Sequence, residues 1–277
     1  MNLLILGSSG TIGSQLFEKF TKKSSINLYT LSRSNNNSNN NNHTIFDFFN
    51  NNLDELNFNI KFDVIINCLG VDIFKKDELI FSVYNKFLNL LKSDKYSIWI
   101  EISSISVMGF NEPLHNNLSF TNYAINKLKA ENSLIKMSKN FNKKCKIFRF
   151  GAVVSNKFIE KFVQDKFQKF IKFNIFFNFF FHSAFIRITT SEEVCRLIDT
   201  TIFSGKNESN IEVHYKNLDV YEILKNKFIE LKIFNIKNKL IYLSLYYLNK
   251  KLYYKFLSIF HANLNFKKKE ISYKLEI

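Results

Sequence analysis

Residues 3–13 read LLILGSSGTIG, and this stretch decides the fold that the sequence predicts. It opens on four consecutive apolar residues, as expected for a short parallel strand buried on both faces. Three glycines follow at the spacing GxxGxxG, and apolar residues then recur at helical spacing at Ile12, Leu16 and Phe20. The stretch therefore predicts a strand, a tight glycine turn and a helix that starts near Thr11.

The glycine turn also predicts a ligand. Gly7 permits the tight turn, Gly10 lets a phosphate approach the backbone, and Gly13 lets the helix pack close to the strand. The amides and dipole at the start of the helix favour a pyrophosphate, so a dinucleotide is the expected ligand. The chain has only seven glycines and three of them fall in this turn, which makes their spacing more informative. A purely structural turn is the alternative interpretation.

The rest of the first half alternates strand-like and helix-like segments. The expected strands span 27–32, 63–68, 97–103 and 146–150, and the expected helices span 11–22, 78–91 and 123–138. Strands separated by helices of this length form βαβ units with right-handed crossovers. We therefore expect an α/β fold of Rossmann type, a doubly wound parallel sheet with ligands at the carboxyl ends of its strands.

Two further motifs carry chemistry. Tyr123 and Lys127 are four residues apart, so they share one face of the expected helix, and a cation beside a phenol favours the phenolate that proton transfer needs. Ser103 and Ser104 end an expected strand, where a hydroxyl can donate a hydrogen bond to a substrate oxygen. Taken alone, these motifs are better explained as a solvated helix face and ordinary loop serines.

Their order along the chain changes that interpretation. Glycine turn, strand-end serine and Tyr-x-x-x-Lys together resemble the short-chain dehydrogenase/reductase superfamily over roughly residues 1–151. More narrowly, they resemble its extended branch, the NAD-dependent epimerase/dehydratase family, which acts mainly on nucleotide sugars. The resemblance implies that Tyr123 is the general acid/base, that Lys127 stabilises its phenolate and holds the nicotinamide ribose, and that Ser104 orients the substrate oxygen.

Other segments extend the resemblance. Residues 63–67 with Gly70 match the family's fourth strand and its turn, and Asp47 matches the aspartate that usually contacts the adenine. Residues 149–151 match the family's segment before the substrate half, although Phe150 stands where proline is usual. The cofactor-binding residues expected from the motifs and the resemblance are Gly7, Ser9, Gly10, Thr11, Ile12, Gly13, Ser32, Arg33, Asp47, Phe48, Cys68, Leu69, Gly70, Tyr123 and Lys127.

The end of the second expected strand predicts NADP in preference to NAD. NAD sites of this fold place a carboxylate there to bind the ribose 2′-hydroxyl, but residues 31–34 read LSRS. Ser32 can hydrogen-bond a 2′-phosphate, and Arg33 can pair with it through charge-assisted bonds. NAD as the cofactor, with Arg33 merely solvated, is the alternative.

The pattern changes after residue 151. Residues 152–277 are expected to form a smaller, mostly helical substrate lobe beside the cofactor domain of residues 1–151, interleaved with it around 183–205. The expected helices of this lobe span 157–172, 191–203 with Ser191 as N-cap, and 218–231. Arg187 interrupts an apolar stretch, and we expect it to contact a substrate phosphate, with a structural arginine as the alternative.

Composition bears on the partners, metals and cellular location to be expected. The net charge of +15 comes from lysines spread over the whole chain, so we interpret it as background and expect no nucleic-acid partner. Three widely spaced cysteines and five dispersed histidines predict no disulfide framework and no metal site, and favour a cytoplasmic protein. Residues 35–42, nearly all asparagine, are expected to form a mobile loop, and residues 236–264 to pack on the protein, with contact to an acidic membrane as the alternative.

The resemblance implies an NAD(P)-dependent epimerase, reductase or dehydratase that acts on a nucleotide sugar. Two other classes stay open: a non-catalytic scaffold that keeps the dinucleotide fold, and a membrane-peripheral reductase of another carbonyl substrate. The intact set of Ser104, Tyr123 and Lys127 argues against the scaffold, which has no need for all three. The exact substrate, the choice among the three reactions and the formation of a homodimer are not decided by the sequence.

Overall fold

The computed structural model describes residues 1–34, 42–47, 60–69, 96–108, 122–171, 185–204, 208–219, 223 and 270–276. Several of the predictions above lie outside the described residues. These are the cofactor contacts Phe48 and Gly70, almost all of the asparagine-rich loop, the helix over 78–91 and the tail over 236–264.

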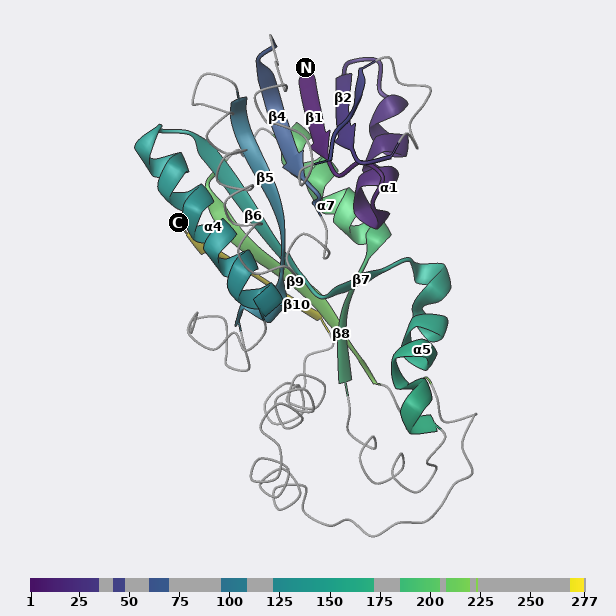
Figure 1. The fold of residues 1–277 in the computed structure, drawn as a ribbon. Helices are drawn as coiled ribbons and strands as arrows, with labels where there is room; N and C mark the ends of the chain where they lie inside the picture. The colour runs from purple at the N-terminus through teal and green to yellow at the C-terminus, as the bar shows by residue number, and fades with distance from the viewer. Residues whose placement is uncertain are drawn as a thin grey trace.

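A single sheet runs through the described part of the chain in the order β3-β2-β1-β4-β5-β6-β9-β8-β7, and β10 pairs with β9 (Figure 1). The strands are β1 (Asn2–Leu6), β2 (Asn27–Ser32), β3 (His43–Ile45), β4 (Phe62–Asn67), β5 (Tyr96–Ser104), β6 (Lys144–Phe150), β7 (Ala152–Val154), β8 (Phe185–Thr190), β9 (Asn210–Asp219) and β10 (Glu270–Glu276). All neighbours from β3 to β9 are parallel, whereas β8 and β10 run antiparallel to β9. The expected Rossmann-type α/β fold is confirmed.

Helices cover both faces of this sheet. The helices of the described residues are α1 (Thr11–Thr21), α4 (Asn122–Asn140), α5 (Ile159–Ile171) and α7 (Ser191–Phe203), with short 3-10 turns η2 (Ile105–Met108) and η3 (Asn156–Phe158). Figure 1 shows α4 on one face and α1 with α7 on the other. Alternation along the strands explains the two layers: in β1, Leu3 and Ile5 pack with α1 and α7, while Leu4 and Leu6 pack with α4.

The second half of the chain contributes more strand than the sequence predicts. The helix expected over 218–231 is wrong at its start, because Leu218 and Asp219 belong to β9. The earlier residues of β9 alternate with period two, burying Ile211, Val213 and Tyr215. The strand continues past them because its last residues pair with β8, which is a non-local contact that the local pattern does not encode.

The helix expected over 191–203 is confirmed, but its N-cap is the preceding residue. The hydroxyl of Thr190 accepts a hydrogen bond from the backbone N–H of Glu193, and Ser191 already has a helical position. Ser191 instead accepts a 2.9 Å hydrogen bond from the amide of Gln15, which ties α7 to α1. Thr190 thereby caps the helix.

The glycine turn between β1 and α1 is too crowded for side chains at two of its positions. Gly7 has φ +76°, in the left-handed region that glycine adopts without strain. A Cβ on Gly13 would lie 2.3 Å from the carbonyl oxygen of Gly7 and 2.8 Å from the Cα of Ser8. A Cβ on Gly10 would meet only the Gly7 carbonyl oxygen, at an ordinary 3.4 Å.

Gly13→Ala should therefore destabilise the protein, while Gly10→Ala should not. The clash at Gly13 is with backbone atoms, so α1 must move away from β1, at a cost of about 1–3 kcal/mol in the free energy of unfolding. Thermal and urea unfolding followed by circular dichroism measure this difference. Equal stability of the two variants would contradict the close packing described here.

Candidate functional site

The glycine turn lies at the carboxyl edge of the sheet, beside the ends of β2 and β4. The backbone N–H of Gly7 donates to the carbonyl of Leu31 at 2.7 Å, and that of Cys68 donates to the carbonyl of Leu6 at 2.9 Å. Leu6 pairs with Asn67 on β4, and Asn67 pairs with Glu101 on β5. The structure thus places the expected contacts at 7–13, 32–33 and 68–69 along one edge, where this fold binds ligands.

The start of α1 combines features that favour an anion. Its N-cap is Gly10, which offers no side chain to the first amides, and its first turn contains no acidic residue. Thr11 is exposed, and Ser9 and Ile12 are partly exposed. Amides that no side chain caps, together with the helix dipole, favour a phosphate at this point.

The two residues expected to select the cofactor differ in accessibility. Ser32 is buried, and its hydroxyl donates to the carbonyl of Ser34 at 2.7 Å. Arg33 is exposed at the end of β2. Asp47 is half-buried just after β3, next to Phe46, whose N–H donates to the carbonyl of Ser32 at 2.9 Å. Arg33 is thus the better placed of the first two to meet a ligand in solution.

Two adjacent serines at the end of β5, Ser103 and Ser104, have different surroundings. Ser103 is buried and donates its hydroxyl hydrogen to the carboxylate of Glu131. Ser104 is half-buried, and its oxygen accepts hydrogen bonds from the N–H of Ser106 at 3.2 Å and from the Ser106 hydroxyl at 3.0 Å. Ser104 therefore keeps its own hydroxyl hydrogen to donate elsewhere.

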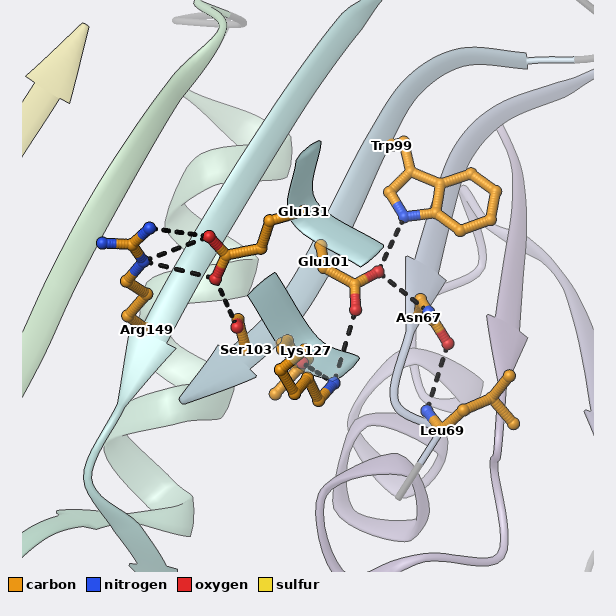
Figure 2. A network of polar contacts seen from close by, with 9 residues as sticks. Asn67, Leu69, Trp99, Glu101, Ser103, Lys127, Glu131 and Arg149 are labelled. Carbon is orange, nitrogen blue, oxygen red and sulfur yellow. Dashed lines mark hydrogen bonds and ion pairs between the residues drawn. The ribbon is translucent and has the colours of Figure 1, made fainter. Parts of the chain in front are cut away.

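Helix α4 carries the expected Tyr-x-x-x-Lys pair. Tyr123 is half-buried and packs against the core on the α4 face of the sheet. Lys127 is almost fully buried, and its ammonium donates to the carbonyl of Ile102 at 2.6 Å and lies 3.4 Å from Oε1 of Glu101 (Figure 2). The helix thus brings Lys127 to the carboxyl end of β5, and Tyr123 lies one helical turn before it.

A second buried ion pair anchors the same helix farther along. Nη2 of Arg149, on β6, lies 2.7 Å from Oε2 of Glu131, and both residues are 1% exposed. Nε of Arg149 donates to the same carboxylate at 3.2 Å. Figure 2 shows this pair and the Glu101–Lys127 pair side by side between α4 and the sheet.

Sequence reasoning missed Glu101. It follows the apolar residues 98–100 and precedes Ile102, it is fully buried, and its partners include Asn67, Trp99 and Lys127. A carboxylate inside an otherwise apolar strand is the one signal that could have revealed it, because a buried charge needs a partner.

Cys68 and Arg187 were predicted to contact the cofactor and the substrate, and the structure describes the surroundings of both. Burial raises the pKa of the Cys68 thiol, and so does the negative charge of Glu101, so Cys68 lines the turn as an uncharged group. Arg187, the expected phosphate contact, is half-buried on β8 and separated from β5 by β6 and β9. Its guanidinium lies 5.2 Å from the centroid of the Tyr215 ring, in cation–π range.

Within the described residues, no cluster of three or more His, Cys, Asp or Glu side chains could hold a metal ion. Among the helices of that same part, none is long and apolar enough to cross a membrane.

Solved structures with this fold include several sugar-nucleotide enzymes. UDP-glucuronic acid 4-epimerase from Bacillus cereus, in complex with NAD, is 20% identical, has a TM-score of 0.63, and the match covers 81% of this chain and 82% of that one. A short-chain dehydrogenase/reductase superfamily protein from Agrobacterium tumefaciens with bound NAD is 12% identical, with a TM-score of 0.63 and coverage of 82% and 81%. UDP-N-acetylglucosamine 4-epimerase from Methanobrevibacter ruminantium M1 is 17% identical, with a TM-score of 0.60 and coverage of 81% and 80%.

A comparison with curated proteins finds no match. The family model for the NAD-dependent epimerase/dehydratase family, in contrast, matches residues 3–173, which is more than half of the chain and spans the glycine turn, β5, α4 and β6. The chain therefore belongs to the NAD-dependent epimerase/dehydratase family and is an enzyme of the short-chain dehydrogenase/reductase type.

Proposed function

We propose that this enzyme is an NADP-dependent epimerase, reductase or dehydratase of a nucleotide sugar, and that Ser104, Tyr123 and Lys127 carry its catalysis. One observation carries the proposal. The start of α1, whose N-cap is Gly10, lies at the same edge of the sheet as the carboxyl end of β5, which α4 contacts. Residues 1–151 hold the cofactor, and residues 152–277 supply the substrate side. The solved relatives support the substrate class, since one was crystallised with UDP-glucuronic acid and NAD.

The glycine turn fits a dinucleotide. Gly10 carries no side chain at the start of α1, so a pyrophosphate can approach the backbone amides there. Cys68 and Leu69 border the turn on the β4 side, and Arg33 borders it on the β2 side. When bound, the cofactor supplies or accepts the hydride.

The protein's own groups handle the proton and the substrate oxygen. Tyr123 exchanges a proton with the substrate hydroxyl or carbonyl, and Lys127, one helical turn away, holds the nicotinamide ribose. Ser104 donates its hydrogen to the same substrate oxygen while accepting from the N–H of Ser106, which fixes the direction of the hydroxyl. Arg187 is proposed to pair with a substrate phosphate.

Replacing Tyr123 with phenylalanine should reduce turnover by about 100- to 10,000-fold, the usual contribution of general acid/base catalysis, and leave cofactor affinity nearly unchanged. Tyr96→Phe is a matched control. Tyr96 is buried on β5, and its hydroxyl has no hydrogen-bond partner among the described residues, so this change should leave turnover intact. Nicotinamide absorbance and product analysis with a panel of nucleotide sugars provide the rates. A Tyr123→Phe variant as fast as wild type would reject the proposed catalytic role.

Arg33→Ala should weaken NADP binding about tenfold or more and leave NAD binding unchanged. The expected loss corresponds to one charge-assisted hydrogen bond to the 2′-phosphate, about 1.5–3 kcal/mol. Arg196→Ala removes an exposed arginine on α7 and controls for net charge. Fluorescence titration with both cofactors measures the affinities. Tighter binding of NAD than NADP by the wild type, or unchanged NADP affinity in the variant, would reverse the assignment in favour of NAD.

Nucleoside diphosphates test the substrate class. At least one of UDP, GDP and dTDP should bind the NADP-loaded protein with a Kd below about 1 mM, or about −4 kcal/mol, in calorimetry. Arg187→Ala should weaken that binding, whereas Arg196→Ala should not. If none of the three binds, the substrate is a small carbonyl compound or a lipid-linked one.

A further inference from the structure

Glu101 is a charged residue at a position where the surrounding strand is apolar. It is fully buried between Ile100 and Ile102, and its backbone pairs with Asn67 on one side and Ile147 on the other. Burying an unpaired carboxylate is costly, so its retention requires strong partners. Asn67, Trp99 and Lys127 are such partners in the part of the chain that the structure describes.

These partners divide the two oxygens between them. Oε2 accepts hydrogen bonds from Nδ2 of Asn67 at 2.8 Å and from Nε1 of Trp99 at 3.1 Å. Oε1 faces the ammonium of Lys127 at 3.4 Å. The two neutral donors thus hold the carboxylate in one orientation, and that orientation directs its other oxygen at the lysine (Figure 2).

The chain of contacts continues to the cofactor edge. Oδ1 of Asn67 accepts a hydrogen bond from the backbone N–H of Leu69 at 3.1 Å. Leu69 belongs to the turn after β4, and its nitrogen would lie 3.2 Å from a Cβ on Gly7. A continuous path of polar contacts therefore runs from the turn beside the glycines through Asn67 and Glu101 to Lys127.

The neighbouring carboxylate, Glu131, has different partners. Glu131 pairs with Arg149 and Ser103, which ties α4 to β5 and β6. Both carboxylates therefore tie α4 to the sheet, but of the two only Glu101 is joined by these contacts to the turn after β4, through Asn67.

We propose that Glu101 is a positioning residue that sets the place of Lys127 relative to the turn at residues 68–69 before the cofactor arrives. The inference rests on the proposed function, in which Lys127 holds the nicotinamide ribose and residues 68–69 border the glycine turn. When Lys127 and the turn at residues 68–69 are already ordered in the free protein, less free energy of binding is lost in ordering them. Loss of Glu101 then weakens contacts to the nicotinamide half of the cofactor and leaves contacts to the adenine half intact.

Glu101→Gln breaks one link of the path selectively. The amide oxygen can still accept from Asn67 and Trp99, while the amide nitrogen that replaces Oε1 is a donor and cannot accept from the Lys127 ammonium. Glu131→Gln is the matched control, because it weakens the ion pair that the same helix makes with Arg149 on β6. Lys127→Met, alone and combined with Glu101→Gln, shows whether Glu101 acts through the lysine.

The experiment measures the affinity of each variant for NADP, for NAD and for ADP, which lacks the nicotinamide ribose. Glu101→Gln should weaken binding of the preferred dinucleotide about tenfold, or about 1.4 kcal/mol, and leave ADP binding unchanged. It should have no further effect in the Lys127→Met background, and Glu131→Gln should change neither affinity by more than a small factor. In assays of turnover, Glu101→Gln should lower kcat as well.

Other outcomes overturn the inference in distinguishable ways. Equal losses for the dinucleotide and for ADP, or additive effects with Lys127→Met, mean that Glu101 only stabilises the fold. Wild-type protein that binds neither dinucleotide rejects the proposed function and this inference together, whereas normal binding by Glu101→Gln rejects the inference alone. If Glu101→Gln does not fold, Asn67→Ser breaks the link between Glu101 and Leu69 instead. Unchanged dinucleotide affinity in that variant would overturn the proposal.

Discussion

Two buried carboxylates hold helix α4 against the sheet, and the geometry of the candidate site depends on them. Glu101 faces Lys127 and Glu131 faces Arg149, with exposures of 4% or less for all four side chains. Removing one partner of such a pair costs about 3–5 kcal/mol, because the other charge is left buried alone. Rotation of α4 about its axis, or a shift along it, would break both pairs at once. Tyr123 and Lys127 therefore have one available position relative to the end of β5.

The sheet register brings the remaining parts of the site to that position. Because β1, β4 and β5 are parallel and pair directly, Leu6, Asn67 and Glu101 lie side by side, and the residues that follow the first two leave the sheet at the same edge. The turn at Gly7 and the turn at Cys68 are then in backbone contact. This contact explains why a crowded, left-handed glycine is needed at residue 7, and it joins the proposed phosphate-binding turn before α1 to the part of the candidate site that contains Lys127.

The sequence predicts the elements that local patterns encode and misses those that depend on distant neighbours. The apolar runs of β1 and β4, the glycine turn and the period of α4 are all local signals, and the structure has each of them. The residues of β9 beyond Tyr215 look helical because their strand pairing is with β8, about thirty residues earlier in the chain. The N-cap of α7 could be Thr190 or Ser191 on residue type alone, and only the hydrogen bond to Glu193 distinguishes them. The role of Glu101 depends on donors from β4, β5 and α4, so a single strand cannot reveal it.

The buried network also determines where recognition of an anionic ligand must come from. Its two cations, Lys127 and Arg149, are each matched by a carboxylate, so the four residues together add no net charge to the site. The net charge of +15 therefore lies on other residues, most of them spread over the chain, and charge spread in this way speeds the approach of an anion. Orientation of a phosphate must then come from fixed dipoles and from cations with a free approach to solvent. The amides at the start of α1 are such dipoles, and Arg33 at the end of β2 is such a cation. For this reason the selectivity between NADP and NAD should depend on Arg33 and be insensitive to the buried lysine.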